Sequence, residues 1–333
     1  MNTSDVVEFI QNARRQSEVP DLSGTDFSGA DLQGVDFRGT NLREAKFVGA
    51  DLRRANLIGA DLSGADLSEA KVSGVRWHGV KLDEASLSGV NLKGAQLDTI
   101  SLVGADLTEA NLREASLRWA NLENCRLTQA ALLDADLTEA NLINASLDFA
   151  NLHAARLELA NLTGANLSNA NLSQSNLAGS TLSGAVLRGV RLSLVNLSGA
   201  TLSETDLSGL DLRGVDFSEA DLSGADLHEA TLTRADLSHA NLSGANLRGA
   251  DLREANLSLA TLKESNLDGA NVTGEQLGGV KSLDDAILPD GRKHKSSDKP
   301  KSGRDNKPAK RRATATGLKA ALDRIKRQQD NEE

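Results

Sequence analysis

Side chains able to carry chemistry are few in this chain and widely spaced. A structural or catalytic zinc ion needs three or four convergent ligands. Neither the histidines nor Cys125, the single cysteine, shows a metal-ligand spacing. The histidines are His78, His153, His228, His239 and His294. We therefore expect no metal site and no cofactor.

Paired carboxylates can act as general acid and general base, and this chain has many, for instance Asp216 and Asp236. Because such pairs recur along the whole sequence, none of them singles out an active site. The 29 glycines recur where the chain must turn rather than in a phosphate-binding loop. These patterns predict a protein that is not an enzyme.

The elements that must position these residues follow from an unbroken five-residue repeat. From Leu22 to Leu277 every fifth residue is Leu, Phe, Val or Trp, which makes 52 consecutive repeats without an insertion. The residue just before this central position is Asp or Asn in 33 of the 52 repeats. The residue two before it is Ala in 34 of the 51 repeats between Thr25 and Glu275. Cys125 holds this small position, which predicts a buried and unreactive thiol.

The five-residue spacing excludes both a straight α-helix and a straight β-strand. Leucines five apart would wind around every side of an α-helix, which turns by about 100° per residue. In a straight strand, an odd spacing would place successive leucines on opposite faces. A single buried stripe is possible only if the backbone turns a corner in every repeat. The repeat therefore predicts a β-helix.

These residues also carry a family resemblance. Segments such as Ala30-Asp31-Leu32 and Ala250-Asp251-Leu252 follow the pattern A(D/N)LXX, and the chain resembles the pentapeptide repeat family over about 260 residues. The resemblance implies an all-β fold, a right-handed quadrilateral β-helix with four repeats, or 20 residues, in each coil. At that period the repeats would form about 13 coils.

The segments at both ends of the repeat array are predicted to cap the open edges of a β-helix. Within residues 1–19, the segment 3–16 predicts a capping helix with Thr3 or Ser4 as its N-cap. Its apolar face would hold Val6, Phe9, Ile10 and Ala13. The β-helix would span residues 20–291. A one-residue slip after Leu277 predicts a bulge, and Pro289-Asp290-Gly291 predicts a final turn.

The remaining residues, 292–333, differ in composition from the repeats. Residues 289–333 hold 7 acidic and 14 basic side chains, whereas residues 1–288 hold 40 acidic and 23 basic ones. We expect a disordered basic tail with a short amphipathic helix near 317–329, able to contact the rod, a protein or nucleic acid. No apolar run approaches the roughly 20 residues that span a bilayer, so we expect a cytoplasmic protein without a membrane contact.

Charge divides unequally among the four faces that a 20-residue coil would create. Totalled over residues 20–279, three faces carry −6, −6 and −5, and the face that begins with residues 30–34 carries +2. That face has a mixed ridge of charged side chains, which is either ordinary solvated surface or a recognition surface. Its candidate contact residues are Arg53, Lys93, Arg113, Arg213 and Arg253.

A second irregularity lies in the middle of the repeats. The last residue of each repeat is often Gly, but never between Glu109 and Leu159. Large apolar residues stand there or one position earlier, where they would point outward. They form a candidate contact patch: Trp119, Leu133, Ile143, Phe149 and Leu159.

These features favour a non-enzymatic interaction scaffold or regulator that presents an acidic rod to a protein partner. The resemblance implies an alternative, because family members that confer quinolone resistance mimic duplex DNA and bind DNA gyrase. Nucleic-acid binding by the basic tail is a third hypothesis, and the protein could be a monomer or a dimer.

Overall fold

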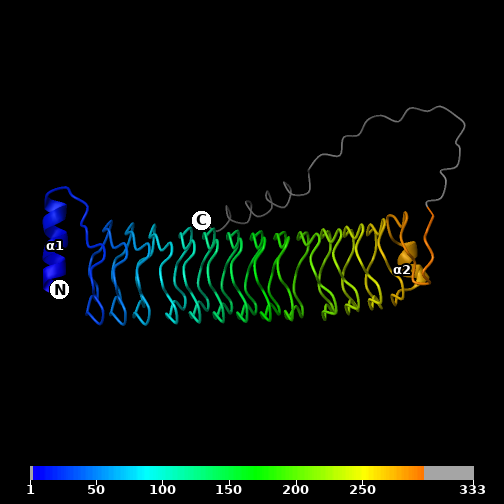
Figure 1. The fold of residues 1–333 in the computed structure, drawn as a ribbon, viewed down its shortest axis with the longest axis horizontal. Helices are drawn as coiled ribbons and strands as arrows, with labels where there is room; N and C mark the ends of the chain where they lie inside the picture. The colour runs from blue at the N-terminus through cyan, green and yellow to red at the C-terminus, as the bar shows by residue number, and fades with distance from the viewer. Residues whose placement is uncertain (1–2, 296–333) are drawn as a thin grey trace, which may run out of the picture. The chain divides into compact units, whose positions relative to one another are not determined.

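The computed structural model describes residues 3–295, which form an elongated stack of coils (Figure 1). Helix α1 spans Thr3–Arg15 and precedes the stack, and the short helix α2, Gly274–Gly278, lies in its last coil. The helix predicted near 317–329 lies outside the described residues.

Successive coils pair through single parallel bridges between residues 20 positions apart. Asp21 pairs with Asn41 and Asn41 with Asp61, and bridges of this kind recur as far as Asn271. The predicted β-helix is therefore present, and four five-residue repeats separate bridged residues. Each residue type in the repeat consequently forms columns that run along the rod.

Every repeat contains a tight turn, which explains its residue preferences. In the repeat Asp26–Ala30, the Ser28 N–H donates to Asp26 Oδ1 at 2.9 Å, and the Ala30 N–H donates to the Phe27 carbonyl at 3.0 Å. Gly29 has a φ of 66°. A positive φ at the third turn residue is the type II pattern, and the aspartate oxygen takes up a backbone donor. Asp or Asn before the central residue therefore stabilises the corner.

The interior is filled by the central residue and the small residue of each repeat. Leu147 and Ala145, for example, are both 0% exposed. Complete burial of a Leu side chain contributes roughly 2 kcal/mol, and the small residue leaves it room. The larger central residues pack in place, since the rings of Phe27 and Phe47 stack with centroids 5.1 Å apart. Trp77 is also buried.

The ladder of backbone hydrogen bonds is interrupted at two places. In the regular register a central N–H donates to the carbonyl 19 residues on, as Leu67 does to Ser86 at 2.8 Å. From Leu22 to Leu252 this bond is missing at four central residues, namely Val72, Trp77, Leu187 and Leu192. We call the gap between residues 69–80 and 88–101 the first opening, and that between 184–194 and 203–213 the second opening. Figure 1 shows wider spacing between coils at both places.

Stacked large residues at the small position explain these openings. In the repeats from Leu22 to Asn271, Val, Ile or Leu stands at both members of a stacked pair three times. These pairs are Val80 with Ile100, Val190 with Leu210, and Val195 with Val215. A lone Val is tolerated, because Val35 stacks on Ala55 and still accepts the Asn56 N–H at 2.9 Å. Val80 and Val190 lack the equivalent bond, whereas Val195, stacked on the smaller Val215, still accepts the Asp216 N–H at 3.2 Å. A Val stacked on an Ile or Leu therefore holds neighbouring coils apart at that corner.

The openings bring core residues toward solvent. From residue 35 to residue 270 the small position is buried throughout, except at Val75, Ala95 and Leu210. These three residues are half-buried, and each lies at the edge of an opening. The ladder stays intact on the remaining faces, so each opening is a wedge and not a break in the rod.

The C-terminal end differs from the predicted repeat pattern. Leu277, counted in the sequence as the last central residue, lies in α2 instead of in a β-helix corner. The predicted one-residue slip is present, because Thr261 pairs with Ser282. Gln276 of α2 donates through Nε2 to the carbonyls of Leu252 and Ala255, at 2.7 and 2.8 Å. The helix thus satisfies carbonyls of the coil that it follows.

A hairpin closes the described part of the chain. Gly291 donates to the Leu288 carbonyl at 2.9 Å with a φ of 77°, which forms the predicted turn. Beyond it Ile287 and Lys293 pair antiparallel. Residues 292–295, expected in the tail, therefore belong to the end of the folded unit.

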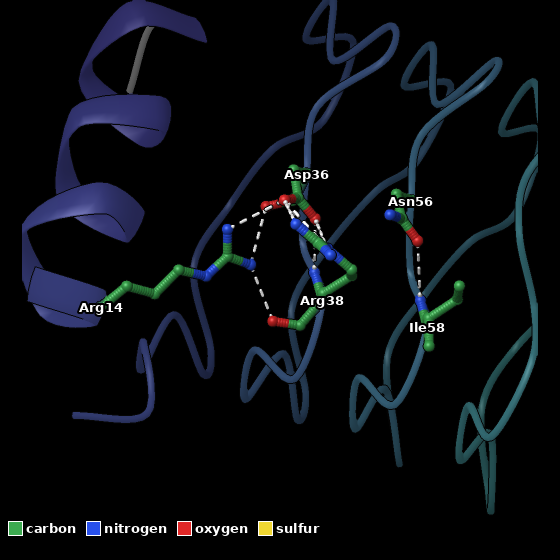
Figure 2. Close-up of polar contacts among 5 residues, drawn as sticks. All are labelled: Arg14, Asp36, Arg38, Asn56 and Ile58. Atoms are coloured by element: carbon green, nitrogen blue, oxygen red, sulfur yellow. Dashed lines mark hydrogen bonds and ion pairs between the residues drawn. The ribbon is translucent and has the colours of Figure 1, made fainter. Parts of the chain in front are cut away.

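At the other end, α1 supplies donors to the carbonyls of the first coil. Arg14 Nη2 donates to the carbonyls of Asp36 and Arg38 at 3.2 and 2.8 Å (Figure 2), and Thr3 Oγ1 donates to that of Asp31. In later coils the equivalent carbonyls accept bonds from the preceding coil. The predicted capping role of this helix is thus explained by backbone groups that have no preceding coil.

Two details of the predicted helix are wrong. Ser4 lies inside α1, and Thr3 is its first residue rather than its N-cap. Phe9 is 39% exposed, whereas Val6 and Ile10 are buried. Residues four apart share one side of a helix, and Phe9 lies about 100° away from Ile10. Only a narrow side of α1 is therefore buried.

We expect Arg14→Ala to loosen α1 while the coils stay folded. The substitution removes two backbone contacts and the ion pair with Asp36, whose atoms are 3.1 Å apart. The expected loss is roughly 1.5–3 kcal/mol of local stability, measured as faster amide exchange in residues 3–15. Arg15→Ala is the matched control, because Arg15 bonds to Asn12 within α1. Equal exchange in the two variants would contradict the capping role.

The same contact is expected to depend on acid pH. The Arg38 side chain, and then Arg14, lower the pKa of Asp36 to about 2 from 3.8. This stabilisation is complete above the unfolded pKa of roughly 3.9, and it is lost as the pH falls through about 2. Asp36 is partly exposed, so solvent screening limits the effect to about 1 kcal/mol. The protection factors of the α1 amides, which are corrected for the intrinsic pH dependence of exchange, should fall as the pH is lowered from about 4 to 2, and Asp36→Asn should remove that dependence.

Candidate interaction surfaces

The turn position of each repeat carries the most unusual side chains. All 50 turn positions from residue 24 to residue 269 have a positive φ, and 27 of them are not glycine. An L-residue in this left-handed region costs about 1–2 kcal/mol relative to its usual conformations. A bulky apolar side chain there therefore carries a conformational cost that glycine avoids.

In the Gly-free stretch, three large apolar side chains are both left-handed and exposed. Trp119, Phe149 and Leu159 have φ values of 56–58° and exposed fractions of 45, 58 and 41%. Leu133 and Ile143, in contrast, are half-buried at the position before the turn. The predicted outward orientation of the first three residues is confirmed, and their binding role stays a prediction.

The structure brings two of these side chains to one corner. Trp119 and Leu159 are separated by two coils in the same column, with Glu139 between them. We call these three residues the Trp119 corner. Phe149 stands half a coil away from that column, at the opposite corner. The predicted patch is therefore not one surface, because a square cross-section separates residues that are close in sequence.

Arg118 orients the indole at the Trp119 corner. Its guanidinium carbon lies 4.4 Å from the centroid of the Trp119 ring. Such a cation over an exposed aromatic ring contributes about 0.5–1 kcal/mol. The ring is thus held in a defined position while 45% of the residue stays exposed.

The ridge on the least acidic face is largely neutralised by its own carboxylates. Arg53 pairs with Asp51 at 2.6 Å, and Arg213 with Asp211 likewise at 2.6 Å. Asp251 and Glu114 similarly pair with Arg253 at 2.6 Å and with Lys93 at 3.2 Å. The Arg53 side chain also lowers the pKa of Asp51.

Arg113 is the exception on this ridge, since it has no ion pair within residues 3–295. The other four candidate ridge residues stand in Asp-Arg or Lys-Glu pairs that expose both signs of charge. The face is therefore a row of internal ion pairs, and it is not a continuous cationic stripe.

The first opening forms a cleft on this same side of the rod. Its volume is about 880 Å³, and Val75, Trp77, Lys93 and Ala95 are among the residues that line it. The sequence predicts Trp77 as a packed central residue or as the mark of a local bulge, and it does not predict the cleft. The signal was present in the stacked pair Val80 and Ile100, but its meaning depends on the 20-residue register.

The structure places the cysteine and the candidate metal ligands of the described residues. Cys125 is buried, its Sγ lies 2.6 Å from the Leu102 carbonyl, and burial raises the pKa of its thiol to about 12. Residues 3–295 contain no group of three or more His, Cys, Asp or Glu side chains arranged to hold a metal ion. Among these residues, no helix has the length and apolar character needed to cross a membrane.

Sequence profiles define the class of this protein. The profile for pentapeptide repeats matches residues 21–59, 155–193, 196–234 and 235–274. The profile for the pentapeptide repeat region matches residues 75–152. The chain belongs to the pentapeptide repeat family, whose fold is a right-handed β-helix.

Several solved structures are similar to this chain. HetL, a pentapeptide repeat protein involved in heterocyst differentiation regulation from the cyanobacterium Nostoc sp., is 30% identical over 88% of this chain and 100% of HetL, with a TM-score of 0.33. QnrB1, a plasmid-mediated fluoroquinolone resistance protein, is 21% identical over 60% of this chain and 90% of QnrB1, with a TM-score of 0.34. A comparison with curated proteins found no match.

Proposed function

We propose that this chain is a non-enzymatic interaction protein that binds a protein partner through the Trp119 corner. The observation that carries the proposal is the placement of Trp119 and Leu159 at left-handed, exposed turns. Glycine occupies 23 of the 50 equivalent positions, so the fold does not require a large side chain there.

The energetic argument is that these side chains are unfavourable in the isolated rod. Each carries a conformational cost of about 1–2 kcal/mol and exposes apolar surface to water. Covering such a side chain contributes about 25 cal/mol per Å², and this gain offsets the cost only when a partner is bound. Trp and other aromatic residues are enriched at the buried centres of protein interfaces.

The geometry of the Trp119 corner also suggests the kind of partner. Two coils correspond to about 9.6 Å along the rod, which is close to the rise of about 10.5 Å between residues i and i+7 of a helix. The carboxylate of Glu139 stands between the two apolar side chains. An amphipathic helix with a basic residue between two apolar ones would therefore complement this corner.

The test uses glycine substitutions, because glycine suits a positive φ. The double variant Trp119→Gly/Leu159→Gly should keep the fold and lose the partner in affinity capture from native lysate. Truncation of such central aromatic anchors typically costs at least about 2 kcal/mol, or roughly 30-fold in affinity. Thermal unfolding should show an unchanged or slightly raised midpoint.

Phe149→Gly is the matched control, since it makes the same change at the opposite corner. It should retain the partner. A partner that binds the double variant and the wild type equally would contradict the assignment of this corner. A partner lost only with Phe149→Gly would move the interface to the other side.

A second candidate function is supported by the charge of the rod. Three faces carry −6, −6 and −5, a distribution that suits mimicry of duplex DNA toward DNA gyrase. Purified protein should then inhibit or protect gyrase in a supercoiling assay, with an effect that weakens as salt increases. The triple variant Asp66→Asn/Asp106→Asn/Asp226→Asn should reduce that effect, whereas Trp119→Gly/Leu159→Gly should not. No effect of the wild-type protein on gyrase would exclude this candidate.

A further inference from the structure

The two coils that border the first opening are intact on their outer sides. Residues 71–80 keep their bonds to the preceding coil, as in Arg54 N–H to the Ser73 carbonyl at 3.0 Å. Residues 91–100 keep theirs to the following coil, as in Leu97 N–H to the Ser116 carbonyl at 2.7 Å. Both coils therefore hold the regular orientation, and their remaining backbone groups point into the opening.

These groups form two complementary edges. By the register of the rod, the N–H groups of Val72, Gly74, Trp77 and Gly79 face the opening from one lip. The carbonyls of Asn91, Lys93, Gln96 and Asp98 face it from the other. None of these eight groups makes its ladder bond within the described coils. The Ala70 and Val75 carbonyls on the first lip and the Asn91 and Gln96 N–H groups on the second likewise make no ladder bond, so each lip presents both donors and acceptors.

The space between the lips has the size and lining of a binding site. A cleft of about 880 Å³ lies within the roughly 300–1,000 Å³ that ligand sites occupy. Trp77, Val75 and Ala95 give it an apolar wall, and the rim carries both signs of charge in Lys93, Asp98 and Glu114. Lys93 and Glu114 pair at 3.2 Å across neighbouring coils.

An extended peptide is the occupant whose chemistry fits both lips. Each edge of its backbone offers N–H groups and carbonyls in alternation, as in β-strand addition. We propose that the first opening binds an extended peptide segment, which pairs with the free backbone groups of residues 71–79 and 91–98. Seating a strand between the lips requires coils about 9.6 Å apart, and the intact ladder on the other faces acts as the hinge.

The experiment uses Trp77 as the reporter. The chain has two tryptophans, so full-length protein with Trp119→Phe reports on the cleft alone. The probe is a blocked synthetic decapeptide with the sequence of residues 230–239, which covers the same two faces in a regular coil. The control probe replaces its two leucines with proline, which removes two N–H donors. A matched protein variant adds Val80→Ala/Ile100→Ala to remove the stacked pair.

The proposal expects a saturable change in Trp77 fluorescence with the first probe and at least about tenfold slower exchange of the amides in residues 71–80. The proline probe should give neither effect, and the Val80→Ala/Ile100→Ala protein should not bind. No response to the first probe at 1 mM, or equal responses to both probes, would overturn the proposal. If the double variant unfolds, the comparison of the two probes on the Trp119→Phe protein decides whether the cleft binds a peptide through its backbone N–H groups.

Discussion

Val190→Ala with Leu210→Ala is expected to close the second opening and slow amide exchange there on the order of 100-fold. Alanine at both positions restores the column found in regular coils, such as Ala145 above Ala165, which are both 0% exposed. The amides of Leu187, Gly189 and Leu192 then regain partners in the next coil. Hydrogen exchange followed by mass spectrometry over residues 184–194 measures the change.

Closing this opening should also raise the free energy of unfolding. Seven ladder bonds are absent there by the register of the rod, and each contributes about 1 kcal/mol net when formed. The substitutions remove five carbon groups, at about 0.8 kcal/mol for each one fully buried. The expected balance is a stabilisation of about 3 kcal/mol. Val35→Ala is the control, because a lone Val leaves the ladder intact. Unchanged exchange in the double variant would disprove the stacked-pair explanation.

The converse substitution is expected to create an opening where none exists. Ala140 and Ala160 lie in the same column as Val80 and Ile100, and both are buried. In Ala140→Val/Ala160→Leu we expect loss of the bonds from Leu142 to Asn161, 2.7 Å long, and from Asn161 to the Ala140 carbonyl, 2.9 Å long. Overpacking costs about 1–3 kcal/mol, and each lost bond adds about 1 kcal/mol. Denaturant unfolding should therefore show a destabilisation of about 3–5 kcal/mol.

Single substitutions separate this effect from a general intolerance of bulk. Ala140→Val alone stacks on Ala120 and Ala160, so it should cost less than about 1.5 kcal/mol and should leave exchange in residues 140–164 slow. The precedent is Val90, which stacks on Ala110 and still accepts the Asn111 N–H at 3.0 Å. If the single variant opened the ladder as far as the double one, the size of one side chain would suffice and the pairing rule would fail.

The openings bear on the two proposed surfaces in different ways. The Trp119 corner lies in the regular part of the rod between them, where the ladder is continuous and the surface is rigid. The cleft at Trp77 lies where the ladder is interrupted, so its shape depends on how far two coils separate. A partner at the Trp119 corner would meet a preorganised surface. A peptide in the cleft at Trp77 would bind more weakly by the free energy needed to widen the wedge.

The sequence by itself determined the fold class and the contents of the core. A period of five with Leu22, Leu32 and their counterparts in one phase admits only a backbone that turns in every repeat, because neither a helix nor a strand keeps that phase. The capping segment, the slip after Leu277 and the burial of Cys125 followed from the same register. These predictions succeeded because each depends on residues close together in the chain.

Only the tertiary structure decided which distant residues share a surface. Trp119 and Leu159 meet at one corner while Phe149 does not, since a 20-residue coil places positions half a period apart on opposite corners. Arg53, Arg213 and Arg253 of the ridge proved to be paired, because the turn aligns each aspartate with the arginine two residues on. The openings depend on contacts between coils, where Val190 meets Leu210 across 20 residues. Packing between coils therefore decides what a repeat pattern within one coil leaves open.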